Sequence, residues 1–276
     1  MFFLRFIAYI LLLVSIIYSN LVLAESNDDK LSITAGYQYT QGKYSQDIDT
    51  VIHYVPVSVL FTRNKWRYEL TVPYIATTGG NVIPGTNGSM FFGGGNTNGI
   101  GGIGMGNNSA TTTSPVTNSG LGDIFARMVY SLDAKKNSDF YYELEANIKF
   151  GTADASKALG TGENDYALGL NTSYGTTTVP YFNIGYKIMG DSAIVDYNNV
   201  VYATAGVSFT ASQTLRYGFS FDYQQTTVNG LNDFQQANIF YSWLQDKNRT
   251  ISFSVLTGLT DSSPDFGAGI YITNKL

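Results

Sequence analysis

The sequence predicts an all-β protein: a transmembrane antiparallel up-and-down β-barrel of twelve strands that follows a cleaved signal peptide. Three observations support this prediction. Only 13% of the 276 residues are charged, about half the usual share in soluble proteins. Apolar and polar residues alternate with a period of two along many segments, as in strands whose two faces meet different surroundings. The connections between these segments are alternately short and long, which is typical of outer-membrane barrels.

The composition excludes several kinds of site. The chain has no cysteine, so it contains no disulfide and no thiolate metal site, and it has a single histidine, His53. Its formal net charge is −5, whereas nucleic-acid binding requires a basic surface. We therefore expect no nucleic-acid partner, no metal and no cofactor.

The first 24 residues have the features of a secretory leader. Arg5 precedes an apolar run from residue 6 to residue 17, and Val22 and Ala24 occupy the positions expected before a cleavage site. The alternative, a membrane anchor helix, needs a longer apolar run. We expect a signal peptide at residues 1–24 and a barrel domain at residues 25–276, which spans the membrane as strands.

The segment at residues 139–150 gives a clear example of the alternation. Its apolar face carries Tyr142, Leu144, Ala146, Ile148 and Phe150, and its polar face carries Glu143, Glu145, Asn147 and Lys149. In a soluble barrel one of these faces would be in the wrong environment, because burying an unpaired charge costs several kcal/mol. A strand between lipid and a polar lumen satisfies both faces.

The same reasoning gives twelve strands in chain order. They are expected at residues 31–41, 50–61, 66–76, 121–132, 139–150, 163–174, 179–189, 197–210, 214–225, 233–245, 249–258 and 265–275. Most have the 9 to 11 residues, or slightly more, that a tilted strand needs to cross a bilayer. An even number of strands places both termini in the periplasm, with short turns on that side and longer loops outside.

Aromatic residues gather near the predicted strand ends. Trp66 and Tyr74 flank the third strand, Tyr166 and Tyr174 the sixth, and Trp243 lies near the end of the tenth. Such positions are typical of the aromatic girdles at the two membrane interfaces. The alternative fold, a soluble β-sandwich or lipocalin-like barrel, would need fewer charges within its strands.

Several short motifs resemble those of a known family. They are Gly120-Leu-Gly-Asp123, Lys149-Phe-Gly-Thr-Ala-Asp154, Gly160-Thr-Gly-Glu163 and Asp165-Tyr166. They resemble the outer-membrane family called MetA-pathway of phenol degradation, over roughly residues 120 to 275. The resemblance implies a barrel channel or transporter in the outer membrane, some of whose relatives are encoded near genes for the degradation of aromatic compounds.

Charged residues within the strands fall on one face by strand parity, and we expect this face to line the lumen. The candidates are Arg67, Glu69, Asp123, Arg127, Glu143, Glu145, Lys149, Asp165, Lys187, Arg216 and Asp222. Five are basic and six are acidic, so strong ion selectivity is not expected. A barrel of twelve strands should enclose a narrow, partly occluded path.

The long connection at about residues 77–119 contains no charged residue and is rich in glycine. It also contains Met90, Phe91 and Phe92, apolar side chains that a solvated loop does not need. We expect an external loop that folds partly over or into the lumen, with these three residues as plug candidates. Surface display or adhesion, and disorder, are the alternatives.

Two other motifs do not indicate an enzyme. The run from Gly99 to Gly104 matches the dinucleotide-binding pattern, but no helix follows it. A barrel hydrolase would need a serine beside the histidine, whereas Val55 occupies the position that shares a face with His53. We therefore expect no enzymatic activity.

The sequence thus favours an outer-membrane channel or transporter for small hydrophobic or aromatic molecules. Its expected partners are outer-membrane lipid, a small-molecule solute and the barrel assembly machinery. The alternatives are a non-transport surface barrel, either an adhesin or a structural protein, and a barrel hydrolase.

Overall fold

The computed structural model describes residues 29–80, 82–83, 104–105, 115–132, 139–192 and 195–276. The signal peptide expected at residues 1–24 lies outside these residues, as does most of the long connection. No helix in the described part of the chain is long and apolar enough to cross a membrane.

Strands make up nearly all the regular structure of the described residues. They are β1 (Lys30–Gly42), β2 (Thr50–Arg63), β3 (Trp66–Gly79), β4 (Val82–Ile83), β5 (Gly104–Met105), β6 (Val116–Leu121), β7 (Ile124–Leu132), β8 (Phe140–Phe150), β9 (Asp165–Tyr174), β10 (Thr178–Ile188), β11 (Val200–Thr210), β12 (Leu215–Gln224), β13 (Phe234–Leu244), β14 (Arg249–Gly258) and β15 (Phe266–Lys275). One short 3-10 helix, η1 (Ala155–Lys157), follows β8.

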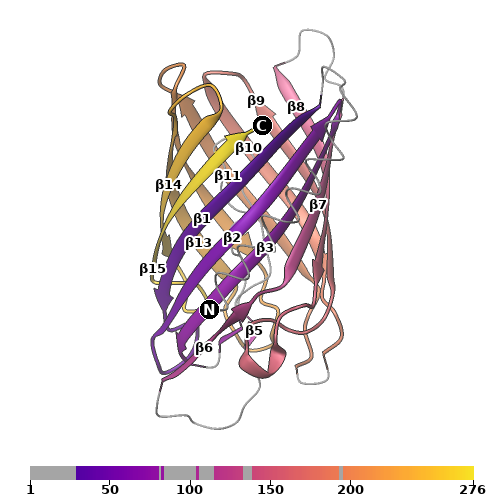
Figure 1. Ribbon diagram of the computed structural model, residues 1–276. Coiled ribbons are helices and arrows are strands. Elements are labelled where there is room, and N and C mark those ends of the chain that lie inside the picture. The colour runs from indigo at the N-terminus through magenta and orange to yellow at the C-terminus, as the bar shows by residue number, and fades with distance from the viewer. Residues whose placement is uncertain (1–28, 81, 84–103, 106–114, 133–138, 193–194) are drawn as a thin grey trace.

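The main sheet closes into a barrel (Figure 1). Each strand pairs antiparallel with the next along the chain, and β1 pairs with both β2 and β15, which joins the two edges. Because β3 pairs first with β7 and then with β6, these two strands form a single crossing. The thirteen strands of the main sheet therefore make twelve crossings. The prediction of a twelve-stranded up-and-down barrel is confirmed. The small β4–β5 pair forms a separate sheet.

The two ends of the barrel differ. The end where β1 begins and β15 finishes carries the short connections at residues 64–65, 175–177, 211–214 and 245–248, and we call it the short-turn end. The opposite, long-loop end carries the connections at residues 43–49, 80–115, 151–164, 189–199, 225–233 and 259–265. Closure gives every strand of the main sheet except β6 a partner on both sides, which limits pairing with other chains.

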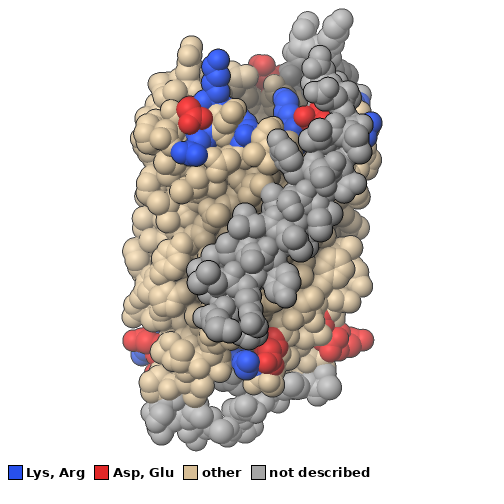
Figure 2. All heavy atoms as spheres, in the orientation of Figure 1, with Lys and Arg blue, Asp and Glu red and all other residues tan. Residues whose placement is uncertain are grey.

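Strand alternation gives the barrel an apolar exterior and a polar interior. On β8, Leu144 faces outward and is 49% exposed, whereas the adjacent Glu145 faces inward and is 2% exposed. On the side of the exterior shown in Figure 2, the charged side chains gather near the two rims of the barrel, with a band free of charge between them. Lipid solvates such a band at little cost, while water would not.

Aromatic side chains on the inner wall lie over glycines of the neighbouring strand. The ring of Tyr271 on β15 covers Gly36, its direct cross-strand partner on β1. A Cβ atom at Gly36 would lie 2.1 Å from the Tyr271 ring, so the ring occupies the space that a side chain would need. Tyr202 covers its partner Gly185 in the same way. These rings therefore lie along the wall and do not cross the lumen.

The strand pairing is interrupted on both sides of the β2–β3 hairpin. Pro56 and Pro73 are direct partners on these strands, and neither has an N–H to donate. Pairing of β2 with β1 stops around Pro56, and pairing of β3 with β6 and β7 stops around Pro73, where the Gly122 N–H bonds to the Pro73 carbonyl. An extra residue at this point forms a β-bulge that turns Asp123 inward. In place of the single strand expected at residues 121–132, the structure has β6 and β7 on either side of this bulge, and the crossing starts earlier, at Val116.

Candidate functional site

The inner wall carries a set of buried ion pairs near the short-turn end. Arg67 on β3 makes a bidentate pair with Glu143 on β8, at 2.7 and 2.8 Å. The Ser131 hydroxyl, from the intervening β7, donates to the same carboxylate at 3.0 Å. Parallel bonds of this type are stronger than single ones and fix the relative position of the two groups.

Arg127 joins two carboxylates in the next layer. Its guanidinium lies 2.8 Å from Glu145 and 3.3 Å from Glu69. Glu145 is fully enclosed and also accepts from the amides of Asn147 and Asn171. Every charge here has an opposite partner, as burial requires.

The polar contacts continue around the wall. Asn183 on β10 donates to Asn171, and its direct partner on β11 is Thr204. Thr204 donates to Asp222 on β12, at 2.7 Å. Asp222 also accepts from two amides of β13, those of Gln236 and Asn238.

These residues form a polar arc over eight consecutive crossings. Its members are Glu69, Arg127, Glu145, Asn171, Asn183, Thr204, Asp222 and Gln236. Ladder partners lie perpendicular to the strands, and barrel strands tilt by about 35–45° from the axis. The arc therefore runs obliquely along the barrel, from the short-turn part of β3 to the long-loop part of β13.

A second ionic cluster lies at the long-loop end. Lys149 on β8 lies 2.9 Å from Asp165 and 3.4 Å from Asp123, and it donates to the Thr161 hydroxyl at 2.5 Å. All four side chains are buried. Nearby, the buried Lys187 donates to Gln224 at 2.8 Å.

All eleven charged residues selected by strand parity have side chains on the inner wall. Ten of them make the contacts described above, whereas Arg216 lies exposed close to the short-turn end of β12. Strand parity predicts the face on which these charges lie, but not that eight of them form ion pairs with one another.

An apolar cluster lies on the inner wall where the arc is absent. It combines residues from β2, β3 and β15 with residues from two long-loop connections. The members are Tyr44, Ile52, Tyr54, Ile75, Ala153, Leu159 and Tyr271. We use the name constriction for these seven buried side chains; Tyr44 and Leu159 reach the group from loops at the same end of the barrel.

The loop backbones are shaped to direct these side chains inward. Tyr44 and Ser45 have φ values of 51° and 60°, in the left-handed region. Tyr44 is 2% exposed, and its hydroxyl donates to Thr40 of β1 at 2.8 Å. Burial raises the pKa of the Tyr44 hydroxyl, so this group remains a neutral donor. Ala158, beside Leu159, also has a left-handed φ of 53°.

The plug candidates Met90, Phe91 and Phe92 lie outside the described residues. Within the described part, the loop residues of the constriction are Tyr44, Ala153 and Leu159, which we did not anticipate. A signal for Leu159 was present, because the pair Ala158-Leu159 is apolar within a glycine-rich, polar connection. Tyr44 stands between Lys43 and Ser45 and gave no such signal.

His53 lies on the exterior face of β2. Its Nδ1 atom is 2.8 Å from the Tyr37 hydroxyl, and its ring packs against those of Tyr37 and Tyr39. This position points away from the lumen and does not support the hydrolase alternative. Among the described residues no group of three or more His, Asp or Glu side chains is arranged to hold a metal ion.

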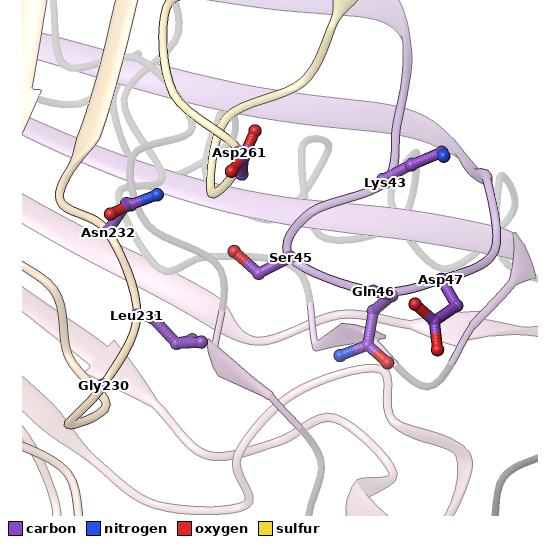
Figure 3. Close-up of a pocket in the computed structure, with 8 residues that line it drawn as sticks. All are labelled: Lys43, Ser45, Gln46, Asp47, Gly230, Leu231, Asn232 and Asp261. Carbon is purple, nitrogen blue, oxygen red and sulfur yellow. The ribbon is translucent and has the colours of Figure 1, made fainter.

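A polar pocket of about 420 Å³ opens at the long-loop end, between three connections (Figure 3). It is lined by Lys43, Ser45, Gln46, Asp47, Gly230, Leu231, Asn232 and Asp261. The Ser45 N–H donates to the Asp261 carbonyl at 2.7 Å, which ties the first loop to the last. Two of its lining residues, Lys43 and Ser45, are the chain neighbours of Tyr44.

Comparison with protein families identifies the barrel. Residues 34–275 match the family described as MetA-pathway of phenol degradation. The chain belongs to this family. No curated protein matches the sequence.

Solved structures give the same fold. The chain is similar to the COG4313 outer membrane channel from Pseudomonas putida F1, with 9% identity, a TM-score of 0.64, and coverage of 91% of this chain and 97% of that one. It is also similar to the NanC porin, with 10% identity, a TM-score of 0.50, and coverage of 89% and 100%. The fold, the family and the charge-free band between the rims in Figure 2 together place this family member in the outer membrane, in contact with its lipid.

Proposed function

We propose that the barrel conducts small hydrophobic or aromatic molecules with one polar group across the outer membrane. The short-turn end faces the periplasm and the long-loop end faces the outside. The COG4313 protein is described as an outer membrane channel, and the family description names phenol degradation, which agrees with this proposal.

The observation that carries the proposal is the division of the inner wall. The constriction supplies apolar and aromatic side chains, and the polar arc beside it supplies hydroxyl, amide and carboxylate groups. Most of these side chains are buried in this state, so a solute reaches them only when the constriction opens. A sugar or a free ion would gain nothing from the first surface, because apolar area favours only solutes that bury apolar area in return. A ring that bears one polar group can use both surfaces.

Most charged residues of the inner wall act mainly on each other. Because Arg67, Arg127 and Lys149 are each held by carboxylates, the wall presents little free charge to a solute. Weak retention of the solute suits a channel, since a bound molecule must also leave. We also propose that the barrel assembly machinery inserts this protein into the outer membrane, as it does other barrels there.

Flux into proteoliposomes tests the proposal. Benzoate and gluconate are compared at a pH where both are anions, so that charge is matched and only benzoate has an apolar face. We expect benzoate to enter severalfold faster than gluconate. Replacing Ile75 in the constriction by Asn should reduce this preference, whereas Val129→Asn, on the inner wall away from the constriction, should leave it unchanged.

Two results would oppose the proposal. Entry of both solutes at the rate of protein-free vesicles would favour the non-transport alternative, a surface adhesin or structural barrel. Equal entry of the two anions in the wild-type protein would indicate a general porin without preference for apolar solutes.

A further inference from the structure

We propose that Lys149, Asp123 and Asp165 form a latch that holds the connection at residues 151–164 against the wall, and that release of this latch opens the constriction. Lys149 is thus a positioning residue that acts through Leu159. The inference rests on the proposed function, because it concerns the control of the same passage.

The position of the latch relative to the connection is the first argument. Lys149 lies just before the connection leaves β8, and Asp165 is the first residue of β9, where the connection ends. Lys149 and Asp165 are direct ladder partners, so their ion pair at 2.9 Å lies across the base of the loop on the inner wall. Asp123 belongs to the bulge on the next crossing, so its contact with Lys149 ties the loop base to the neighbouring wall.

The contacts of the latch with the loop itself are the second argument. Lys149 donates to the Thr161 hydroxyl, near the end of the loop. The Asp123 carboxylate accepts from the Ala153 N–H at 2.9 Å, near the beginning. The three charged groups thus hold the loop at both of its arms, and Leu159 lies between these two points.

Close packing is the third argument. A Cβ atom at Gly160 would lie 2.5 Å from an Asp123 carboxylate oxygen, and one at Gly120 would lie 2.9 Å from a Leu159 methyl group. The loop thus lies directly against the wall only because these positions lack side chains. Leu159 is 1% exposed in this position and contributes to the constriction.

The charges make the latch sensitive to the loss of its single cation. Two buried carboxylates flank Lys149, and Lys187 lies close enough to act electrostatically on Asp165. A neutral side chain at residue 149 would leave Asp123 and Asp165 to repel each other beneath the loop. The barrel wall, which is held by its own ladders, does not depend on these contacts.

Thiol labelling of the folded barrel in detergent tests the latch, and the absence of native cysteine keeps the assay free of background. Ala158→Cys places a thiol at a buried loop position, and Lys157→Cys places one at an exposed neighbour. We expect a bulky water-soluble maleimide to label residue 158 slowly in the parent and severalfold faster when Lys149→Met is added. Residue 157 should react at one rate in both.

A second pair of variants covers the case in which Lys149→Met fails to fold. Asp123→Ala leaves the Lys149–Asp165 pair in place but removes the acceptor for the Ala153 N–H, and it should also speed labelling of residue 158. Asp123→Asn keeps an oxygen at that position and should restore slow labelling. Unchanged labelling of residue 158 in Lys149→Met and Asp123→Ala would overturn the latch.

Benzoate flux in proteoliposomes completes the test. Variants with a released loop should conduct benzoate severalfold faster than wild type, and Asp123→Asn should not. A loop that labels quickly without any gain in flux would contradict a role in gating. Absence of flux in every variant would count against the proposed function, and labelling would then still decide whether the latch holds the loop.

Discussion

At the scale of single residues, most charges of the inner wall neutralise one another. Arg127 illustrates the cost of this arrangement, since it is shared between Glu69 and Glu145. A buried ion pair adds little net stability compared with apolar packing, yet loss of one partner is expensive. Strand parity predicts that such side chains point inward, but the choice of partner depends on register and could not be read from the sequence.

Replacing Arg127 by Met should destabilise the barrel by about 3–5 kcal/mol, because Glu69 and Glu145 would remain buried without their cation. Arg216→Met, at an exposed position on the same inner wall, should change stability by only about 0.5 kcal/mol. Urea unfolding in detergent micelles, followed by the heat-dependent shift of the folded band on gels, gives both values. Equal effects of the two substitutions on stability would show that the ion pairs of Arg127 are not the reason for the destabilisation.

The outward residues allow a matched test of depth in the membrane. Leu144→Arg should cost about 2–4 kcal/mol, because this side chain points outward from the middle of β8. Phe140→Arg, on the same face at the first residue of the strand, should cost about 0–1 kcal/mol. Unfolding from lipid vesicles measures the difference, and a greater cost at Phe140 would place the membrane at another level.

At the scale of strands and loops, the local sequence pattern explains where the strands lie, whereas the bulge and the course of the loops depend on long-range pairing. Period-two alternation predicts all twelve crossings, because most strands separate lipid from a largely polar interior. The bulge at Gly122 and Asp123 was not predicted, since it arises from the pairing with Pro73 on another strand. The inward course of the loop with Leu159 depends equally on contacts that only the closed barrel provides.

The pairing of Gly36 with Tyr271 offers a test at this scale. Gly36→Ala should destabilise the barrel, because the new methyl group would displace the Tyr271 ring and break its hydrogen bond to Gln38. Adding Tyr271→Ala should remove the clash, so the double variant should be more stable than the sum of the single effects indicates. A double-mutant cycle from urea unfolding measures this coupling, and additive effects would contradict the packing described here.

At the scale of the whole molecule, the barrel has two unlike ends, and its orientation follows from them. In intact cells, Asn232→Cys at the long-loop end should react with an impermeant maleimide, whereas Asp246→Cys in a short turn should react only after the outer membrane is opened. Labelling of both denatured proteins provides the control for thiol reactivity. The reverse labelling pattern would show that the barrel is inserted in the opposite orientation.

The central claim is that this barrel admits small apolar or aromatic molecules, and uptake by intact cells tests it most directly. Cells that lack the protein are compared with cells that carry the wild-type gene or its Ile75→Asn variant, using a panel of aromatic and polyhydroxylated acids at low concentration. We predict that loss of the protein slows uptake of the aromatic acids alone, that the wild-type gene restores it and that the variant restores it only in part. Uptake of the aromatic acids that is unaffected by loss of the protein would contradict the claim.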